Sequence, residues 1–406
     1  MSEVNTQQHN VPSDIHKNDI HNVDIHNVEW SVARLLAHRS ASPLGTDSVA
    51  LSSAIGRVLA DDLVALQDLP PAHTSMMDGY AVAGESPWTI VGSVRAGEFR
   101  IDLDSGTAVK VNTGAHIPAT TRFVIPDEVA LVEDNVLRCA TELPEGKHVR
   151  LPGDEARASE LIAAKGTVVN PAVAGLAASS GVDTLTVFVR PTVDVVVTGD
   201  ELISQGIAGP GHIRDSLSVQ VPAWVEGLGA VAGAPRRCVD TLADTVQTLS
   251  ECAAHIIVTT GGTAHGEFDF IRSAVAELNG TFIVDEIHMR PGHPCFIAQI
   301  PTGQIIVSVP GNPLAALVSF MTLVDPLVRG FTGRTLPELD TAQLDRHESV
   351  DRTRITPVHV HGGVAHTTEY RGSAMLRGLV NATHLAVIPA GTNQPGTLLQ
   401  LLQLPW

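Results

Sequence analysis

Acidic residues follow the first of three apolar, β-branched runs in this chain, and carboxylates in that position suit a metal site. Residues 198–201 (TGDE) place Asp200 and Glu201 side by side. Adjacent carboxylates at a strand end can hold Mg²⁺ through oxygen ligands, which would let an acidic protein bind a phosphate. An equally good interpretation is a helix start, with Asp200 as the N-cap and Glu201 complementing the helix dipole.

The loop after the second run, residues 259–270 (TTGGTAHGEFDF), combines glycines, hydroxyls and acids. Gly261 and Gly262 would let backbone N–H groups approach an oxyanion. Asp269 is a candidate metal ligand or only a charge at a helix N-terminus, and His265 is better explained as a loop residue than as a ligand. The loop contains neither G-x-G-x-x-G nor a P-loop lysine, so neither nucleotide-binding fingerprint applies.

Two further loops are candidates for binding an anion. The third apolar run is followed by residues 310–313 (PGNP), where an asparagine N-cap and a proline would start a helix. Residues 289–294 (MRPGHP) contribute Arg290, the only permanent cation of that segment, and His293, which is charged when protonated. An arginine in a turn can also be simply solvated. Earlier in the chain Asp78 precedes a glycine in SMMDGYAV, where a turn explains the pair equally well.

The three apolar runs are the elements that must position these loops. They span residues 193–197, 255–260 and 305–309. Runs that are apolar on both faces are typical of buried parallel strands, and helix-sized segments lie between them. We therefore predict a doubly wound α/β domain over residues 191–335. In such a sheet the loops at Thr198, Gly261 and Pro310 should line one crevice beyond the carboxyl ends of the strands.

The rest of the chain predicts a multidomain protein in which a β domain is inserted into a helical one. The predicted regions are a disordered polar tail (1–28), a discontinuous helical linker domain (29–64 and 151–190), an inserted β domain (65–150), the α/β domain (191–335) and a C-terminal β-barrel (336–406). The tail repeats Asp-Ile-His at residues 14–16, 19–21 and 24–26. Its histidines could bind a divalent metal, but a period of five aligns them on no helix or strand face.

The amino-acid composition argues against several classes of binding partner. The 406 residues include 26 Lys and Arg against 44 Asp and Glu, and the net charge of −18 argues against nucleic acid and anionic membranes. The four cysteines form no C-x-x-C pair, which indicates neither a zinc site nor a disulfide framework. The N-terminus has no basic and apolar leader pattern, and the apolar stretch 313–328 is interrupted by Ser319, Thr322 and Asp325. We expect a cytoplasmic protein.

Five motifs in order, SMMDGYAV, VVVTGDEL, TTGGTAHGEFDF, MRPGHP and VPGNPLAALVSF, resemble those of the molybdopterin molybdenumtransferases, the family that includes the gephyrin E domain. The resemblance implies Mg²⁺-dependent conversion of adenylated molybdopterin and molybdate into molybdenum cofactor with release of AMP, in a homodimer whose α/β crevice is completed by the partner. It implies the catalytic acids Asp78, Asp200, Glu201 and Asp269, of which Glu201 and Asp269 bind metal, and the substrate-binding residues Thr113, Gly261, Gly262, Arg290, Gly292, His293, Pro310, Gly311, Asn312, Pro313 and Ser373.

The chain also departs from the family pattern. MRPGHP stands where the family has K-P-G-K-P, residues 215–217 (DSL) replace Asp-Ser-Asn, and residues 238–240 (CVD) stand where an Asp pair is common. The family's arginine in the C-terminal domain corresponds to Pro357 or to a shifted Arg354. These departures leave a second hypothesis, a catalytically weakened or non-catalytic molybdopterin-binding scaffold paralogue.

Overall fold

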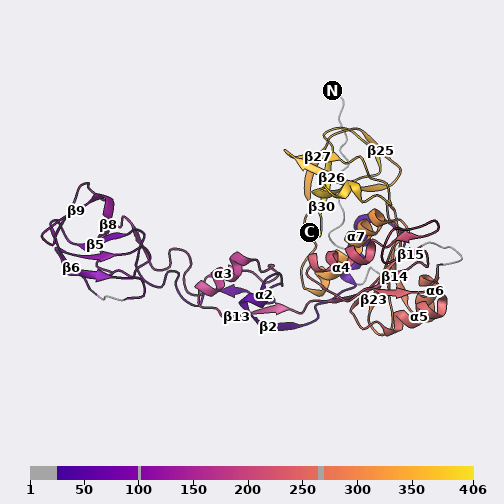
Figure 1. Ribbon diagram of the computed structural model, residues 1–406, viewed down its shortest axis with the longest axis horizontal. Coiled ribbons are helices and arrows are strands. Elements are labelled where there is room, and N and C mark those ends of the chain that lie inside the picture. The colour runs from indigo at the N-terminus through magenta and orange to yellow at the C-terminus, as the bar shows by residue number, and fades with distance from the viewer. Residues whose placement is uncertain (1–24, 99–101, 264–268) are drawn as a thin grey trace, which may run out of the picture. The chain divides into compact units, whose positions relative to one another are not determined.

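The chain forms two compact units, one inserted into the sequence of the other (Figure 1). The computed structural model describes residues 25–98, 102–263 and 269–406. The main unit contains residues up to Gly45 together with Val189–Trp406, and the inserted unit contains Thr46–Phe188. His265 and the first two Asp-Ile-His repeats lie outside the described residues.

The central sheet of the main unit is the predicted α/β sheet. Its strands run in the order β1-β20-β22-β23-β19-β14-β17, and β18 also pairs with β14. Their bounds are β1 (His26–Val28), β14 (Thr192–Thr198), β17 (Val231–Ala232), β18 (Arg236–Cys238), β19 (Ile256–Thr260), β20 (Thr281–Ile287), β22 (Phe296–Gln299) and β23 (Ile305–Val309). Within this sheet only β22 runs antiparallel to its neighbours. The three apolar runs are therefore strands β14, β19 and β23, and the doubly wound α/β class is confirmed.

Helices cover both faces of the sheet because alternate strand residues point to opposite sides. Val195 and Val197 pack with α1 (Trp30–Arg39), α4 (Leu217–Gly227) and α7 (Pro313–Phe331), whereas Val196 packs with α5 (Leu242–Glu251) and α6 (Phe270–Glu277). Helix α7 is long and apolar enough to cross a membrane by length and composition, but 94% of its apolar window is buried inside the unit. It is the core helix between the sheet, α1 and the C-terminal barrel.

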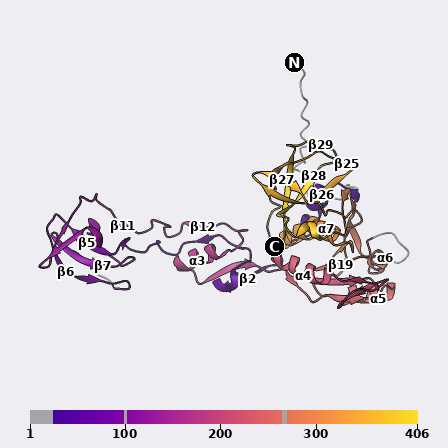
Figure 2. The same cartoon turned by 45° about the horizontal axis from the view of Figure 1, so that its top comes forward.

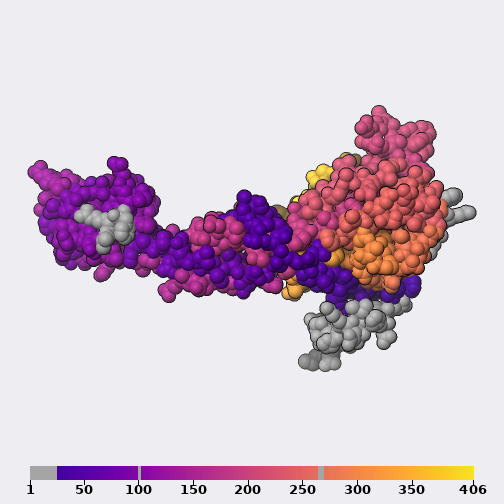
Figure 3. Space-filling model, turned by 90° about the horizontal axis from the view of Figure 1, so that it is seen from below, coloured from indigo at the N-terminus to yellow at the C-terminus, as the bar shows by residue number. Residues whose placement is uncertain are grey.

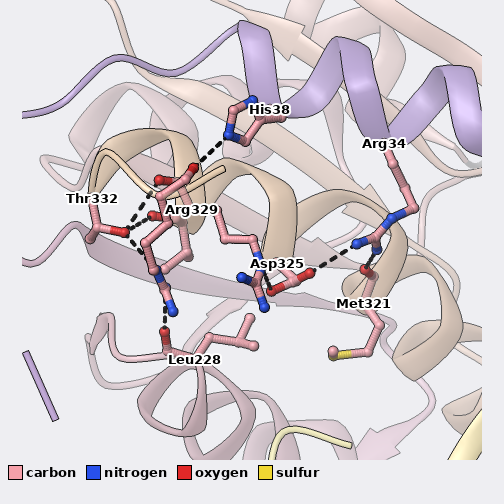
Figure 4. A network of polar contacts seen from close by, with 9 residues as sticks. Arg34, His38, Leu228, Met321, Asp325, Arg329 and Thr332 are labelled. Carbon is pink, nitrogen blue, oxygen red and sulfur yellow. Dashed lines mark hydrogen bonds and ion pairs between the residues drawn. The ribbon is translucent and has the colours of Figure 1, made fainter. Parts of the chain in front are cut away.

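Buried polar contacts attach α1 to α7 (Figure 4). Trp30 Nε1 donates to Thr322 Oγ1 at 3.1 Å. Arg34 donates to the Met321 carbonyl at 2.7 Å and to Asp325 Oδ2 at 3.2 Å, and Arg329 Nε donates to the other oxygen of Asp325 at 2.8 Å. One buried carboxylate thus balances two arginines, which is the pairing that makes burial of charge tolerable.

The structure differs from the predicted grouping at the N-terminus. Helix α1 belongs to the main unit and not to the predicted linker domain. Its partners on α7 lie almost 300 positions away in the chain, so no local pattern could reveal this packing. His26–Val28, at the end of the predicted disordered tail, form strand β1 in parallel register with β20. Val28 is buried in the main core, and this burial explains why the strand docks.

The C-terminal region is the predicted barrel (Figure 2). Each strand of the barrel pairs with the next in the spatial order β26-β27-β24-β30-β28. Strand β28 also pairs with β26, so the ring is closed. A neighbouring strand, β21, pairs with β26, and β25 pairs with β29. The bounds are β21 (Met289–Arg290), β24 (Asp340–Leu344), β25 (Glu348–Val350), β26 (Thr353–His361), β27 (Val364–Thr367), β28 (His384–Ile388), β29 (Gly391–Asn393) and β30 (Leu398–Gln403).

The inserted unit contains the predicted β domain, a sheet of order β8-β5-β7-β6-β10-β9. Its remaining part is built from two distant segments, indigo and magenta in Figure 3, joined by the pairs β2–β13 and β3–β12. This part is less helical than predicted. The elements are β2 (Thr46–Ala50), α2 (Leu51–Ala54), β3 (Leu63–Val64), β4 (Thr74–Ser75), β5 (Gly79–Ala83), β6 (Trp88–Val94), β7 (Thr107–Val111), β8 (Phe123–Pro126), β9 (Ala130–Glu133), β10 (Val136–Cys139), β11 (Val149–Arg150), β12 (Leu161–Ala163), α3 (Pro171–Ser179) and β13 (Thr184–Phe188).

We predict that Asp325→Asn destabilises the main unit by about 3–5 kcal/mol, because it leaves Arg34 buried without its counter-ion. Chemical unfolding of the variant and the wild type measures the difference. Asp47→Asn removes the half-exposed partner of Arg57 and serves as the control, with an expected loss below about 1 kcal/mol. Equal losses in the two variants would contradict the role given to Asp325.

Candidate active site

The loops that follow β14, β19 and β23 line one cavity of about 630 Å³, here called the strand-end cavity. The predicted crevice is therefore present. Thr198, Gly261 and Gly311 line it at the three strand ends, and the N-termini of α4 and α7 meet there. The described residues that line it are Thr198, Gly199, Glu201, Leu202, Ile213, Arg214, Asp215, Ser216, Leu217, Asp240, Thr245, Thr260, Gly261, Gly262, Phe270, Ile271, Gly311, Asn312, Pro313, Ala374 and Leu376.

Asp240 holds the first loop in place. Its two carboxylate oxygens accept from the backbone N–H groups of Gly199 and Asp200, each at 3.1 Å. Glu201 lines the strand-end cavity, whereas Asp200 is exposed and is not among the described lining residues. The loop continues into a two-stranded ribbon of β15 (Leu202–Ile203) and β16 (Ile213–Arg214). Asp240 was singled out in the sequence only as a departure, since its pairing with a loop 40 residues earlier leaves no local signal.

The second loop has no room for side chains at Gly261 and Gly262. A Cβ on Gly261 would lie 2.8 Å from Thr198 Oγ1, and one on Gly262 would lie 2.5 Å from Ile271 Cγ1. Both residues have positive φ, at 91° and 65°, which disfavours any replacement further. Asp269 lies behind Gly262, with Oδ1 3.2 Å from that Cβ position, and both of its carboxylate oxygens are shielded from solvent. Residues 264–268 lie outside the described part of the chain.

A second cavity, of about 530 Å³, adjoins the first and is here called the arginine cavity. The α/β part contributes the predicted Arg290, Gly292, His293 and Pro310, and the barrel contributes Ser373. Asn312 lines both cavities, and Ser373 and Ala374 are adjacent residues that line one cavity each. The predicted substrate-binding residues of the main unit thus divide between two neighbouring spaces.

Two arginines of the barrel, Arg354 and Arg371, line the arginine cavity. Neither was predicted as a site residue, although Arg354 is one of the two residues that the resemblance matches to the family's C-terminal arginine. Strand pairing of β21 with β26 puts Arg354 in register with Arg290. Arg371 lies two residues before Ser373 and donates from Nη1 to Glu348 Oε1 at 2.5 Å. This local signal, a cation beside the predicted site serine, could have identified Arg371. Register between strands 64 residues apart could not be read from the sequence.

Arg290 and His293, the two cations of the MRPGHP segment, differ from each other in exposure and in hydrogen bonding. The Arg290 side chain is 55% exposed, and its guanidinium lies 3.6 Å from Asp351. His293 Nδ1 lies 2.8 Å from the Ile287 carbonyl, so the proton of the neutral ring is on Nδ1. Its Nε2 lies 3.6 Å from Glu286 Oε2 and can donate to an anion only after protonation.

Asp78 and Thr113 lie together in the inserted unit. Asp78 Oδ1 accepts from the Thr113 backbone N–H at 2.6 Å and from Thr113 Oγ1 at 2.9 Å. These bonds, the backbone one first, lower the pKa of Asp78 below its ordinary value. Asp78 and Thr113 both belong to the inserted unit.

Within the described residues no group of three or more His, Cys, Asp and Glu side chains is arranged to hold a metal ion. Glu201 and Asp269 are separate carboxylates on two loops. Mg²⁺ commonly takes only one or two protein carboxylates and completes its shell with substrate phosphates and water, so a Mg²⁺ site does not require a cluster of three protein ligands.

Comparison with known families accounts for almost the whole chain. The MoeA N-terminal region (domain I and II) matches residues 27–181, a probable molybdopterin binding domain matches residues 194–330, and the MoeA C-terminal region (domain IV) matches residues 341–404. A molybdopterin molybdenumtransferase of Synechococcus elongatus is 31% identical over 388 residues, covering 89% of this chain and 94% of the relative. The chain belongs to the molybdopterin molybdenumtransferase family.

A second relative and a solved structure are also similar to this chain over most of its length. Molybdopterin molybdenumtransferase 2 of Mycobacterium tuberculosis is 33% identical over 301 residues, covering 70% of this chain and 74% of the relative. The crystal structure of a molybdopterin biosynthesis MoeA protein from Pyrococcus horikosii matches with a TM-score of 0.74 at 25% identity, over 93% of this chain and 99% of that chain. Membership of this transferase family gives the chain a role in molybdenum cofactor biosynthesis.

We predict that Thr113→Val raises the pKa of Asp78, because the variant keeps the backbone donor and loses the hydroxyl that stabilises the carboxylate. The carboxylate of the wild type stays ionised to lower pH than that of the variant. Carboxyl-carbon NMR of Asp78 across an acid titration measures both values, and Thr113→Ser, which retains a hydroxyl, should keep the wild-type value. An unchanged pKa in Thr113→Val would contradict this role of Thr113.

Proposed function

We propose that this protein inserts molybdenum from molybdate into adenylated molybdopterin and releases AMP. The observation that carries the proposal is the pair of adjoining cavities, one at the strand ends and one lined by arginines, that share Asn312. A nucleotide-carrying substrate needs a larger space with backbone donors. A small oxyanion needs a separate space lined by cations, next to the reacting atoms.

In this proposal the strand-end cavity binds the pterin substrate. The backbone N–H group of Gly262 approaches the phosphates without interference from a side chain, whereas the N–H group of Gly261 already donates to the Val309 carbonyl at 2.8 Å. The positive end of the α7 dipole faces the same space. Asp240 keeps the first loop in its observed path, so that Glu201 stays at the cavity wall. Asp200 then acts through the conformation of this loop.

Glu201 and Asp269 are the proposed Mg²⁺ ligands. Mg²⁺ held there would neutralise charge on the phosphate oxygens as the bond to AMP breaks. Glu201 lines the cavity directly, and Asp269 lies behind Gly262 on the loop that approaches the phosphates. Molybdate is the second substrate, and the arginine cavity is its proposed site.

The proposal includes a homodimer in the cytoplasm. Asp78 and Thr113 belong to the inserted unit, and the resemblance stated above implies that a second copy completes the site with them. The ionised, hydrogen-bonded Asp78 would then supply a fixed acceptor to the substrate. Light scattering that finds only monomer at micromolar concentration would contradict this part.

We predict that the purified protein releases AMP from adenylated molybdopterin when molybdate and Mg²⁺ are added. Glu201→Gln and Asp269→Asn should each slow this release about 100-fold or more, because each removes a ligand that stabilises developing charge. Glu277→Gln, an exposed acid at the end of α6, is the matched control and should keep the wild-type rate.

Two results would contradict the proposal. One is the absence of AMP release by the wild type under conditions in which another member of the family is active. The other is release that continues at the wild-type rate in Glu201→Gln and Asp269→Asn. Tight binding of the pterin substrate without AMP release would instead support the non-catalytic alternative, which Leu217 favours by presenting an apolar side chain to the strand-end cavity.

A further inference from the structure

We infer that Arg371, a residue of the barrel, makes the principal contact with the oxyanion in the arginine cavity. The inference rests on the proposed function in taking molybdate, a tetrahedral dianion, as the ligand. Arg371 thus takes the role of main anion-binding cation, which the sequence motif predicted for Arg290.

One nitrogen of the Arg371 guanidinium is fixed by a hydrogen bond, and the other nitrogens can still donate. Its Nη1 donates to Glu348 Oε1, and the Glu348 side chain is only 8% exposed. Among the described residues no hydrogen bond is found for the remaining N–H groups of Arg371, which lines the cavity. A guanidinium fixed at one nitrogen can present its other N–H groups to two oxygens of a tetrahedral anion.

The neighbouring residues of β26 strengthen the site. Arg354 lines the cavity, and its Nη1 lies 3.9 Å from Glu348 Oε2, so one buried carboxylate lies near both arginines. Thr356 lies two residues on, on the same face of the strand as Arg354. Thr356 is 2% exposed, and its hydroxyl has no hydrogen-bond partner within the part of the chain that the structure describes. A buried hydroxyl without a partner beside a cavity is the kind of group that a ligand oxygen satisfies.

Arg290 is less suited to be the principal contact. Its side chain is more exposed than that of Arg371, 55% against 30%, and Asp351 lies beside it. Water weakens the interaction of an exposed charge with an anion, and a half-buried guanidinium retains more of it. Two barrel arginines also explain how a chain that lacks the family's two lysines in this turn can still hold a dianion.

Isothermal titration with inorganic molybdate tests the inference, with inorganic phosphate as a parallel titration. Arg371→Ala should weaken molybdate binding at least about tenfold, the loss expected for a charged hydrogen bond, and Arg371→Lys should recover part of it. Arg346→Ala removes the same charge from an exposed site of the barrel outside the cavity, and it should bind like the wild type.

A double variant separates contact from folding and from overall charge. Arg371→Gln with Glu348→Gln removes one cation and one anion, leaves the net charge unchanged and allows a side-chain hydrogen bond between the two positions. If Arg371 only stabilises Glu348 in the fold, molybdate affinity returns to the wild-type value. If Arg371 contacts the anion, affinity stays at least about tenfold weaker.

The outcomes distinguish this inference from the proposed function. Weakened molybdate binding in Arg371→Ala and in the double variant supports the inference, whether or not phosphate binding falls as well. Wild-type molybdate affinity in Arg371→Ala or in the double variant, or a loss confined to phosphate, overturns it while AMP release by the wild type stands. A wild type that neither binds molybdate nor releases AMP overturns the proposed function first.

Discussion

Burial of helix α7 on all sides is the constraint on which the main unit depends. Nearly every residue from Leu314 to Phe331 is buried, so the helix must be covered on all sides, and the central sheet, α1 and the barrel provide that cover. The polar residues that interrupt its apolar sequence are used as anchors, since Thr322 and Asp325 bind Trp30 and Arg34 of α1. The exposed end of this arrangement is the helix N-terminus, and the two cavities meet there at Asn312.

The sequence predicted those parts of the fold that depend on local pattern. The strands β14, β19 and β23 were recognisable because a strand buried on both faces is apolar throughout, and the loops after them line the expected cavity. Helix α1 was misplaced because amphipathic spacing indicates a helix and does not say which surface it covers. Arg354 was not predicted to line the site for a related reason: its position depends on a barrel that closes between distant strands. Arg371 could have been identified from its place beside the predicted Ser373.

The arginine cavity is lined by positive charges, although the protein as a whole has a negative net charge. The net charge of −18 would repel a dianion at long range, and the arginine cavity places three guanidinium groups in one space. Because solvent and salt screen distant charges within about 10 Å, the nearby arginines dominate the potential in the cavity. Glu348, buried near Arg354 and Arg371, keeps these two cations in place.

In the proposed function the strand-end cavity binds the pterin substrate and the arginine cavity, on the side of the barrel, binds the oxyanion. Crystals of the protein grown with molybdate, with diffraction collected at the molybdenum absorption edge, test this most directly. We predict an anomalous peak in the arginine cavity within hydrogen-bonding distance of Arg371 and Arg354. A molybdenum peak only in the strand-end cavity, or bound by Arg290 with no contact to the barrel, would contradict the account.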